Sequence, residues 1–161
     1  MNAIELLESQ HREVESLFKK FEKADGPGKE ELFEQIADAL AVHASIEEKQ
    51  FYPATRSQRT EDELREAVEE HLSVKRIIAD LLECDPEDAQ FEAKVKVLKE
   101  QVEHHVQEEE EELFPKVKKE VSADELEDLG MAMEDLASEL KASGAPREAV
   151  PAETAHPAPL E

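Results

Sequence analysis

The sequence predicts an all-α protein: an up-down-up-down four-helix bundle of two pseudo-symmetric helical hairpins, with a fifth, C-terminal helix beside it. Three observations predict this fold. Apolar residues recur at three- and four-residue spacing along five stretches of the 161-residue chain. The composition is rich in Glu, Leu, Ala and Lys and includes only four glycines, which favours helix over sheet. The first two helical stretches also recur as the third and fourth.

The helices of the first hairpin are bounded by local signals. We expect the first helix from about Ala3 to Ala24, because Asn2 can cap its N-terminus and Glu5 completes a capping box. A second helix is expected from about Lys29 into the fifties. Pro53 should end or kink it, since proline lacks the N–H that a continuing helix needs.

The second hairpin and the fifth helix carry similar signals. The third helix should begin after Thr60, which heads another capping box. Asp85 is followed by proline and should be the N-cap of a fourth helix that reaches Pro115 or slightly beyond. Ser122 opens the fifth, shorter helix.

The last part of the chain differs in composition from the rest. Four of the eight prolines lie beyond residue 142, among Ala and Glu. Such a segment offers little apolar surface to bury. We therefore expect one domain over residues 1–142, the bundle with its flanking helix, and a disordered Pro/Ala-rich tail over residues 143–161.

The charge balance narrows the choice of partners. There are 19 Lys and Arg against 42 Asp and Glu, a net charge of −23. Nucleic acids and anionic membranes both need a cationic face, so neither is an expected partner. A strongly acidic chain suits cation binding and favours a monomer.

Other sequence features predict the compartment. No apolar run reaches the length of a membrane span, and the first ten residues, with Glu5 and Glu8, do not form a signal peptide. The single cysteine, Cys84, excludes an intramolecular disulfide and a thiolate metal cluster. We expect a soluble cytoplasmic protein.

The internal repeat brings the same polar residues to matching positions. A shift of 62 residues places His43 on His105 and Glu47 on Glu109, and each pair lies one turn apart on a helix face that also carries apolar residues. A shift of 60 residues places His11 on His71, again on apolar stripes. Six polar side chains are therefore predicted to point into the core: His11, His43, Glu47, His71, His105 and Glu109.

Burying these groups is costly unless something compensates their charge. A pair of divalent cations would do so, with carboxylates bridging and imidazoles completing each metal. Four His and two Glu without thiolate favour iron, with manganese or zinc as alternatives. A lone core His is more often a hydrogen-bonded structural residue, and a His-Glu pair arises often by chance in a Glu-rich chain. The symmetric repeat favours metal ligation over a metal-free acidic bundle that acts through partners.

The paired pattern resembles the hemerythrin-like family, also called HHE cation-binding domains, over roughly residues 3–140. The resemblance implies a non-haem di-iron centre, with an oxo or hydroxo bridge, inside a four-helix bundle. It further implies that Glu47 and Glu109 bridge, that the four His are terminal ligands, and that the centre binds O₂ or a related ligand such as NO or peroxide. The matching residues are His11, His43-x-x-x-Glu47 with Tyr52-Pro53, His71, and His105-x-x-x-Glu109 with Phe114-Pro115.

One position departs from the oxygen-carrying members of that family. Those carriers have a fifth His one turn from the His of the third helix, where this chain has Lys75 and Ala67 around His71. Water or Tyr52 could fill the gap, although Tyr52 is expected to be a packing residue at the helix end. Two functions stay open: a module that binds the ligand for sensing, storage or delivery, and an enzyme that consumes peroxide or NO or donates iron for repair.

Several other residues are not expected to be metal ligands. His104 is expected at the edge of the site or exposed, and Cys84 is expected to be a packing residue. A ferritin-like site needs Glu-x-x-His on two helices, and only Glu8 and His11 have that spacing. The remaining acidic residues near the motifs and the last histidine are assigned to a solvated face and to the tail: Glu48, Glu108, Glu110, Glu111, Glu112 and His156.

Overall fold

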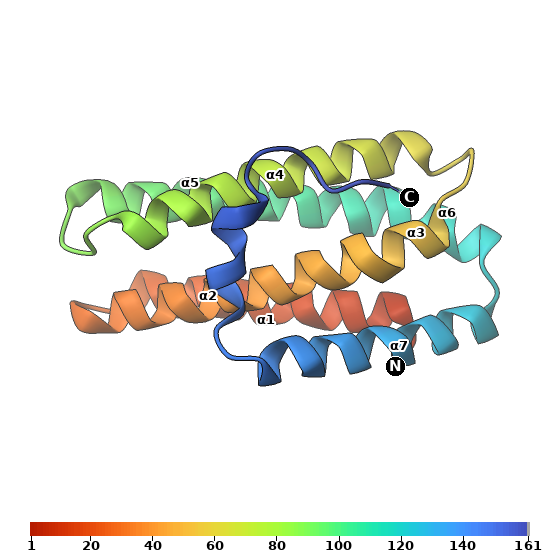
Figure 1. Ribbon diagram of the computed structural model, residues 1–161, viewed down its shortest axis with the longest axis horizontal. Coiled ribbons are helices and arrows are strands. Elements are labelled where there is room, and N and C mark those ends of the chain that lie inside the picture. The colour runs from red at the N-terminus through yellow and green to blue at the C-terminus, as the bar shows by residue number, and fades with distance from the viewer. Residues whose placement is uncertain (161) are drawn as a thin grey trace.

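The computed structural model describes residues 1–160 of the chain, all of them in helices and their connections, without a strand. Four long helices form two antiparallel hairpins that lie side by side (Figure 1). The first hairpin is α1 (Ala3–Lys23) with α2 (Pro27–Ile46), and the second is α4 (Glu61–Glu83) with α5 (Ala89–Glu108). The predicted helical bundle is confirmed.

Pro53 neither ends nor breaks the second helix. In a regular α-helix its ring would clash with the carbonyl group four residues earlier. The chain instead widens into η1 (Glu47–Phe51), a π turn in which the Tyr52 N–H donates to the Glu47 carbonyl group. The helix then continues as α3 (Tyr52–Thr55).

The repeat reproduces this device in the second hairpin. Pro115 is preceded by a second π turn, η2 (Glu109–Leu113), in which the Phe114 N–H donates to the Glu109 carbonyl group. The helix continues as α6 (Phe114–Glu120). Each π turn therefore begins at the Glu of the repeated motif.

Two of the predicted caps differ in the structure, while those at Asn2 and Ser122 are present. The Thr60 hydroxyl does not cap α4, because it donates to the Thr55 carbonyl group at 2.9 Å and so closes the preceding loop. Helix α5 begins later than expected, and its N-cap is Asp88, whose side chain accepts from the Gln90 N–H at 2.8 Å.

Helix α7 (Ala123–Ala142) flanks the first hairpin and packs against α1 and α2. Its interior contains Gly130, which faces the start of α1. A Cβ atom built there would lie 2.5 Å from the Met1 carbonyl oxygen and 2.8 Å from the Ala3 nitrogen. The missing side chain is what allows the two helices to come this close.

The structure corrects the prediction of a disordered tail for residues 143–160; Glu161 lies outside the described residues. The segment includes a 3₁₀ helix, η3 (Pro146–Glu153), which runs across the first hairpin from α7 to α4 (Figure 1). Arg147 donates to Asp38 through its backbone N–H and its guanidinium, both at 2.9 Å, and the guanidinium also lies 2.6 Å from Glu34. Val150 is buried. The composition predicted disorder because it does not reveal that the bundle supplies an apolar seat and acidic partners.

The apolar core consists of two clusters. One surrounds the α3, α6 and α7 end of the bundle and includes Leu7, Phe51, Leu64 and Phe114. The other fills the opposite half and includes Phe18, Ile36, Ile78, Phe91 and Leu98. The six polar residues predicted to face inward occur in neither cluster.

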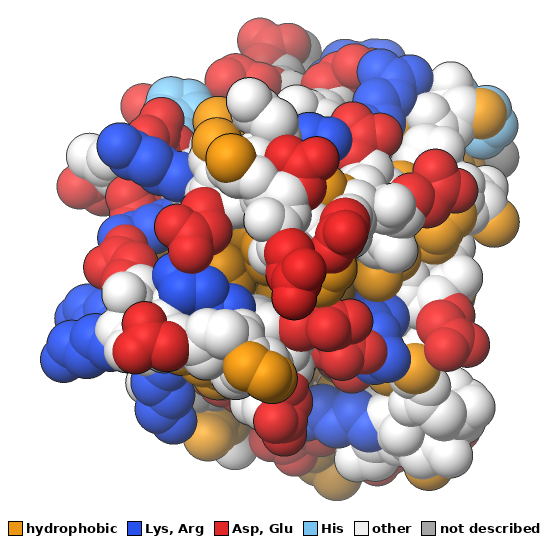
Figure 2. Space-filling model, turned by 90° about the vertical axis from the view of Figure 1, so that its left-hand side faces the viewer, with side chains coloured by type: hydrophobic (Ala, Val, Ile, Leu, Met, Phe, Trp, Pro, Cys, Tyr) orange, Lys and Arg blue, Asp and Glu red, His pale blue; other side chains and the backbone are white. Residues whose placement is uncertain are grey.

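The surface carries both signs of charge. The bundle end in Figure 2 shows acidic and basic side chains intermixed around a recess with visible hydrophobic side chains. Within residues 1–160, no helix is long and apolar enough to cross a membrane.

Candidate metal centre

The six predicted side chains lie together between the two apolar clusters. His11 comes from α1, His43 from the end of α2 and His71 from α4, and His105 lies near the end of α5. Glu47 and Glu109 are the first residues of the two π turns. All six are buried, and Glu47 is 0% exposed. The fold therefore brings together the residues that the repeat singled out.

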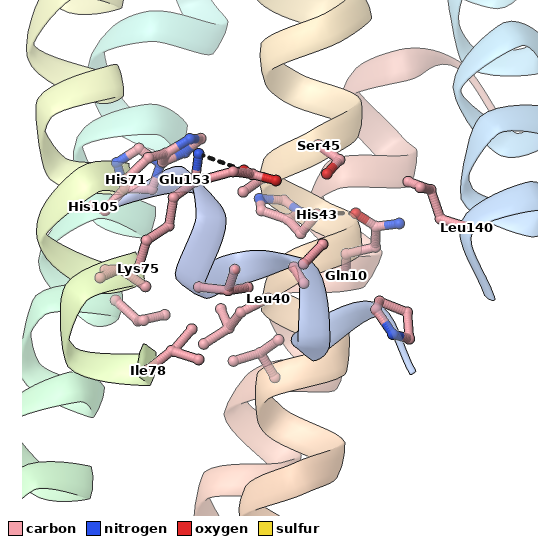
Figure 3. Close-up of a pocket in the computed structure, with 18 of the residues that line it drawn as sticks. Gln10, Leu40, His43, Ser45, His71, Lys75, Ile78, His105, Leu140 and Glu153 are labelled. Atoms are coloured by element: carbon pink, nitrogen blue, oxygen red, sulfur yellow. Dashed lines mark hydrogen bonds and ion pairs between the residues drawn. The ribbon is translucent and has the colours of Figure 1, made fainter. Parts of the chain in front are cut away.

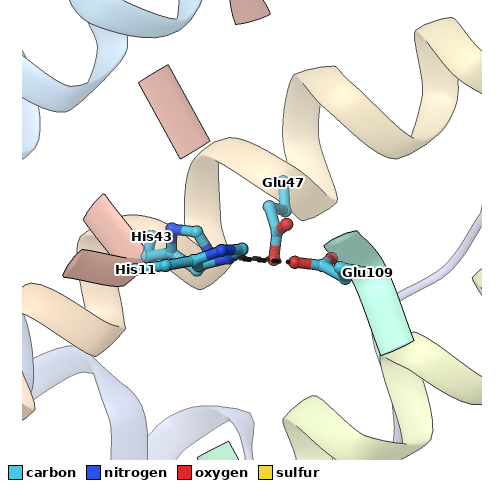
Figure 4. Close-up of side chains that lie close together, drawn as sticks. All are labelled: His11, His43, Glu47 and Glu109. Carbon is cyan, nitrogen blue, oxygen red and sulfur yellow. Dashed lines mark hydrogen bonds and ion pairs between the residues drawn. The ribbon is translucent and has the colours of Figure 1, made fainter. Parts of the chain in front are cut away.

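The first group of potential ligands belongs mainly to the first hairpin. His11, His43, Glu47 and Glu109 each offer an atom, and these atoms all lie within 4.8 Å of one another. Figure 4 shows the two imidazoles facing the two carboxylates. His11 Nε2 is 3.2 Å from Glu109 Oε1, and His43 Nε2 is 3.3 Å from Glu47 Oε1.

The second group uses the same two carboxylates with the imidazoles of the second hairpin. His71, His105, Glu47 and Glu109 again offer atoms within 4.8 Å of one another. His71 Nε2 lies 3.0 Å from Glu47 Oε1, and His105 Nε2 lies 3.3 Å from Glu109 Oε2. Two adjacent sites thus share both carboxylates, and each site has two imidazoles of its own.

The outward nitrogen of each imidazole has a partner that fixes the ring. The Nδ1 atoms of His11, His71 and His105 lie 2.6–2.7 Å from the carboxylates of Glu110, Glu48 and Glu70, and His43 Nδ1 lies 2.7 Å from Gln10 Oε1. Ionised carboxylates and an amide oxygen can only accept, so Nδ1 carries the proton and a neutral ring turns its Nε2 lone pair inward. This orientation is the one that metal-bound histidines adopt.

Two buried polar atoms at the centre, His43 Nε2 and Glu47 Oε2, lack a hydrogen-bond partner among the described residues. A buried acceptor without a partner costs about 1–3 kcal/mol. A cation would satisfy both atoms, since each is a lone-pair donor. The residues present therefore fit a pair of metal ions.

Comparison with known proteins gives the family. A sequence model described as "Hemerythrin HHE cation binding domain" matches residues 2–117. The chain belongs to this family.

Two other comparisons place the chain among known proteins. A solved structure of a hemerythrin HHE cation binding domain-containing protein from Mycobacterium kansasii superimposes with a TM-score of 0.79, at 27% identity over 89% of each chain. A curated relative, a DNA nickase from Nostoc sp., is 30% identical over 128 residues, which are 79% of this chain. The match spans only 36% of that relative's length.

Tyr52 of this HHE domain is more than the packing residue expected from the sequence. Its hydroxyl donates to Glu109 Oε2 at 2.6 Å, lies 3.1 Å from Glu47 Oε1 and is 3.2 Å from His71 Nε2. The equivalent residue of the second hairpin is Phe114, whose ring stacks on His11 with a centroid distance of 6.0 Å. The centre is therefore asymmetric: a hydroxyl contacts the carboxylates from one hairpin only.

Lys75 lies one turn after His71 on α4, and its side chain contacts carboxylates outside the two groups of potential ligands. Its Nζ lies 2.9 Å from Glu48 Oε1 and 3.0 Å from Glu153 Oε1. The other oxygen of Glu48 contacts His71 Nδ1. The lysine thus supports His71 through a carboxylate, and each site of the HHE domain keeps two imidazoles.

The outer carboxylates are the functional residues that sequence reasoning missed. Glu48 and Glu110 were assigned to a solvated face, whereas both contact a site imidazole, and Glu48 is only 8% exposed. Positions 48 and 110 are equivalent in the repeat, and this equivalence could have indicated a shared role. The many other Glu residues around them made the equivalence inconspicuous. His104, by contrast, is exposed, as expected.

The site carboxylates set the proton affinity of the imidazoles. Burial disfavours the charged form of His105, but Glu109 and Glu47 outweigh burial and raise its pKa well above 6.5. The pKa values of His11 and His71 are raised for the same reason. Without metal, protons on these rings compensate the carboxylate charge.

The pKa values of the two site carboxylates are lowered rather than raised. Burial disfavours ionised Glu47, yet the imidazoles of His43 and His105 outweigh it and hold the pKa of Glu47 well below 4.5. Burial and the charge of Glu47 oppose ionisation of Glu109, and the contacts with His105 and His11 still lower its pKa. Both groups therefore stay ionised and available to cations at neutral pH.

Proposed function

We propose that this HHE domain holds two iron ions that share Glu47 and Glu109. His11 and His43 would complete one iron, and His71 and His105 would complete the other. The centre would bind O₂, or a related small ligand such as NO or peroxide, for sensing, storage or delivery. The observation that carries this proposal is the pair of four-residue groups with both carboxylates in common.

The donor chemistry supports iron over other metals. All donors are imidazole nitrogen or carboxylate oxygen, and the single cysteine, Cys84, does not belong to the site. Such a mixed set suits iron, with manganese and zinc as alternatives. Iron would supply reversible redox chemistry and open positions for a small ligand. The residues themselves orient the imidazoles through their Nδ1 partners and hold a neutral hydroxyl, that of Tyr52, beside the carboxylates.

Metal analysis tests this proposal. Protein loaded with ferrous iron without air and then exposed to air should contain two irons per chain and show the charge-transfer absorption of a bridged ferric pair. Because Glu47 serves both sites, Glu47→Ala should lose both irons, whereas His105→Ala should abolish the bridged absorption.

Exposed residues of the same type provide matched controls. Glu111 and His156 are exposed and belong to no group of potential ligands, so Glu111→Ala and His156→Ala should keep two irons and the full absorption. Wild-type protein that takes up no iron after loading would refute the proposed centre.

A second candidate function is enzymatic, and the engagement of Lys75 favours it. The Lys75 side chain is bound to Glu48 and Glu153 and so adds no ligand to either site. Each site keeps two imidazoles. An open coordination sphere suits consumption of peroxide or NO, or donation of iron, more than stable carriage. Turnover assays on iron-loaded protein distinguish the two functions. Ligand binding without multiple turnovers would exclude the enzyme and support the binding module.

We infer that nucleic acid is not a partner of this chain and that it is a monomer. A net charge of −23 opposes approach to a phosphate backbone and to a second copy. We therefore do not expect this chain to nick DNA, the activity of the Nostoc relative, and the match spans only 36% of that protein.

A further inference from the structure

A cavity of about 170 Å³ adjoins the metal centre on one side only. All four imidazoles line it, whereas neither Glu47 nor Glu109 does. Figure 3 shows His43, His71 and His105 along one part of it, with Leu40 and Ile78 lower in the view. The cavity therefore meets the centre at its imidazole face.

The carboxylate face of the centre is closed. Phe51, Tyr52 and Phe114 are almost completely buried there, at 0%, 0% and 1% exposure. The pocket that touches Glu109 has a volume of about 20 Å³. That is enough for roughly one water, since a water needs about 10–15 Å³ by this measure. A larger molecule can reach the centre from the imidazole side.

The body of the cavity is apolar, and its size matches a small organic molecule. Cavities of about 150 Å³ with aliphatic walls exclude water and bind benzene or xenon. Lys75 introduces no free charge, because Glu48 and Glu153 neutralise it. The walls include the aliphatic side chains of Val14, Leu40, Val74, Ile78, Val102 and Val106.

The roof of the cavity comes from the C-terminal strap, residues 143–153. Ala145, Ala149 and Val150 line the cavity from this side. The strap lies beyond residues 2–117, the part of the chain that matches the family model. Two ion-pair groups fasten it, Arg147 to α2 and Glu153 to Lys75.

We propose that this cavity binds a small apolar organic molecule, up to the size of a single aromatic ring, beneath the strap and against the four imidazoles. The volume exceeds what a diatomic gas needs, and the aliphatic walls disfavour an ion or a polar metabolite. The ligand leaves when the strap lifts. The proposal deepens the proposed function, because it names the kind of molecule that the metal centre would face.

Benzene is the probe, and metal-free full-length protein with labelled methyl groups is the sample. Titration followed by NMR should give saturable shifts of the methyl groups of Val14, Leu40 and Val102. Ala41 also lines the cavity, so Ala41→Leu adds three carbon atoms there and should weaken benzene binding at least tenfold. Ala93→Leu, on the exposed side of α5, is the matched control and should leave the affinity unchanged.

The strap provides a second variant that does not alter the cavity walls. Arg147→Ala removes the guanidinium contacts with Glu34 and Asp38 but keeps the backbone N–H bond to Asp38, and benzene should then exchange at least threefold faster. Shifts that do not saturate, or an affinity that Ala41→Leu leaves unchanged, would overturn the proposal. The titration needs no iron, so the two proposals are tested separately. Protein that takes up two irons but does not bind benzene would contradict only the organic ligand. Protein that binds benzene but takes up no iron would contradict only the di-iron centre.

Discussion

At the residue scale, the repeat predicts which side chains meet at the centre but not what surrounds them. Helical spacing gives the direction of His43 and Glu47, because His43 precedes the π turn and Glu47 is its first residue. Beyond Glu47 the wider turn changes the direction of every following side chain. The position of the Tyr52 hydroxyl between two carboxylates could therefore not be derived from α-helical spacing. The roles of Glu48 and Glu110 could not be predicted from the sequence, because many neighbouring Glu residues share their spacing.

The Tyr52 hydroxyl should stabilise the metal-free protein more than the metal-loaded form. Burial and the charges of Glu109 and Glu47 raise the pKa of Tyr52 well above 10.0, so it remains a neutral donor. Tyr52→Phe leaves buried carboxylate oxygens without this donor, and the free energy of unfolding of metal-free protein should fall by about 1–3 kcal/mol. Urea denaturation with and without chelator measures the difference. Equal losses in both forms would contradict this assignment, because bound cations should replace the hydroxyl.

At the element scale, the hairpins could be predicted and the two departures from regular helix could not. Apolar periodicity and caps locate α1, α2, α4 and α5 to within a few residues. Whether a proline ends a helix or is absorbed by a π turn depends on the packing of the residues beyond it. Here Phe51 and Tyr52 are fully buried, and that burial keeps the chain helical through Pro53. The strap was missed because its partners lie on other helices.

The packing of α7 on the start of α1 depends on Gly130. Alanine favours helix by about 1 kcal/mol over glycine, so Gly130→Ala would stabilise a free helix. In the protein, the added Cβ would meet the backbone of Met1, Asn2 and Ala3 at 2.5–2.8 Å. We expect a net loss of about 1–3 kcal/mol, measured by chemical denaturation.

Gly28 provides the control for this substitution. It lies in the first turn of α2, and a Cβ there meets its nearest neighbour, Ala24 Cβ, at an ordinary 3.8 Å. Gly28→Ala should be neutral or stabilising by up to about 1 kcal/mol. A stabilising effect of Gly130→Ala would show that α7 does not depend on this close approach.

At the scale of the whole molecule, pH should act on the two forms in opposite directions. The raised pKa values of His11, His71 and His105 stabilise metal-free protein fully below 6.5, and this stabilisation is lost as pH rises through the folded-state values. The lowered pKa values of Glu47 and Glu109 contribute stability above 4.5 that is lost as pH falls through the folded-state values. Metal-free protein should therefore be most stable between these limits.

Metal reverses the trend above pH 6.5, because the imidazoles must lose their protons to bind it. The melting temperature of metal-free protein should fall from pH 6.5 upward, whereas that of metal-loaded protein should rise over the same range. Calorimetric scans of both forms across pH 5–9 measure this. Parallel curves would mean that the imidazoles are not the groups that bind metal.

The position of the polar layer between the two apolar clusters has a consequence for how the molecule unfolds. In the empty protein, four imidazoles and two carboxylates lie between two hydrophobic half-cores. Metal ions shared by Glu47 and Glu109 would join both hairpins across that layer. Because the metal ligands come from all four long helices or their π-turn extensions, metal would hold these helices together at the boundary between the two halves. We expect the halves to open one after the other when the centre is empty and together when it is filled. Metal loading would thus decide whether this chain behaves as one cooperative unit or as two.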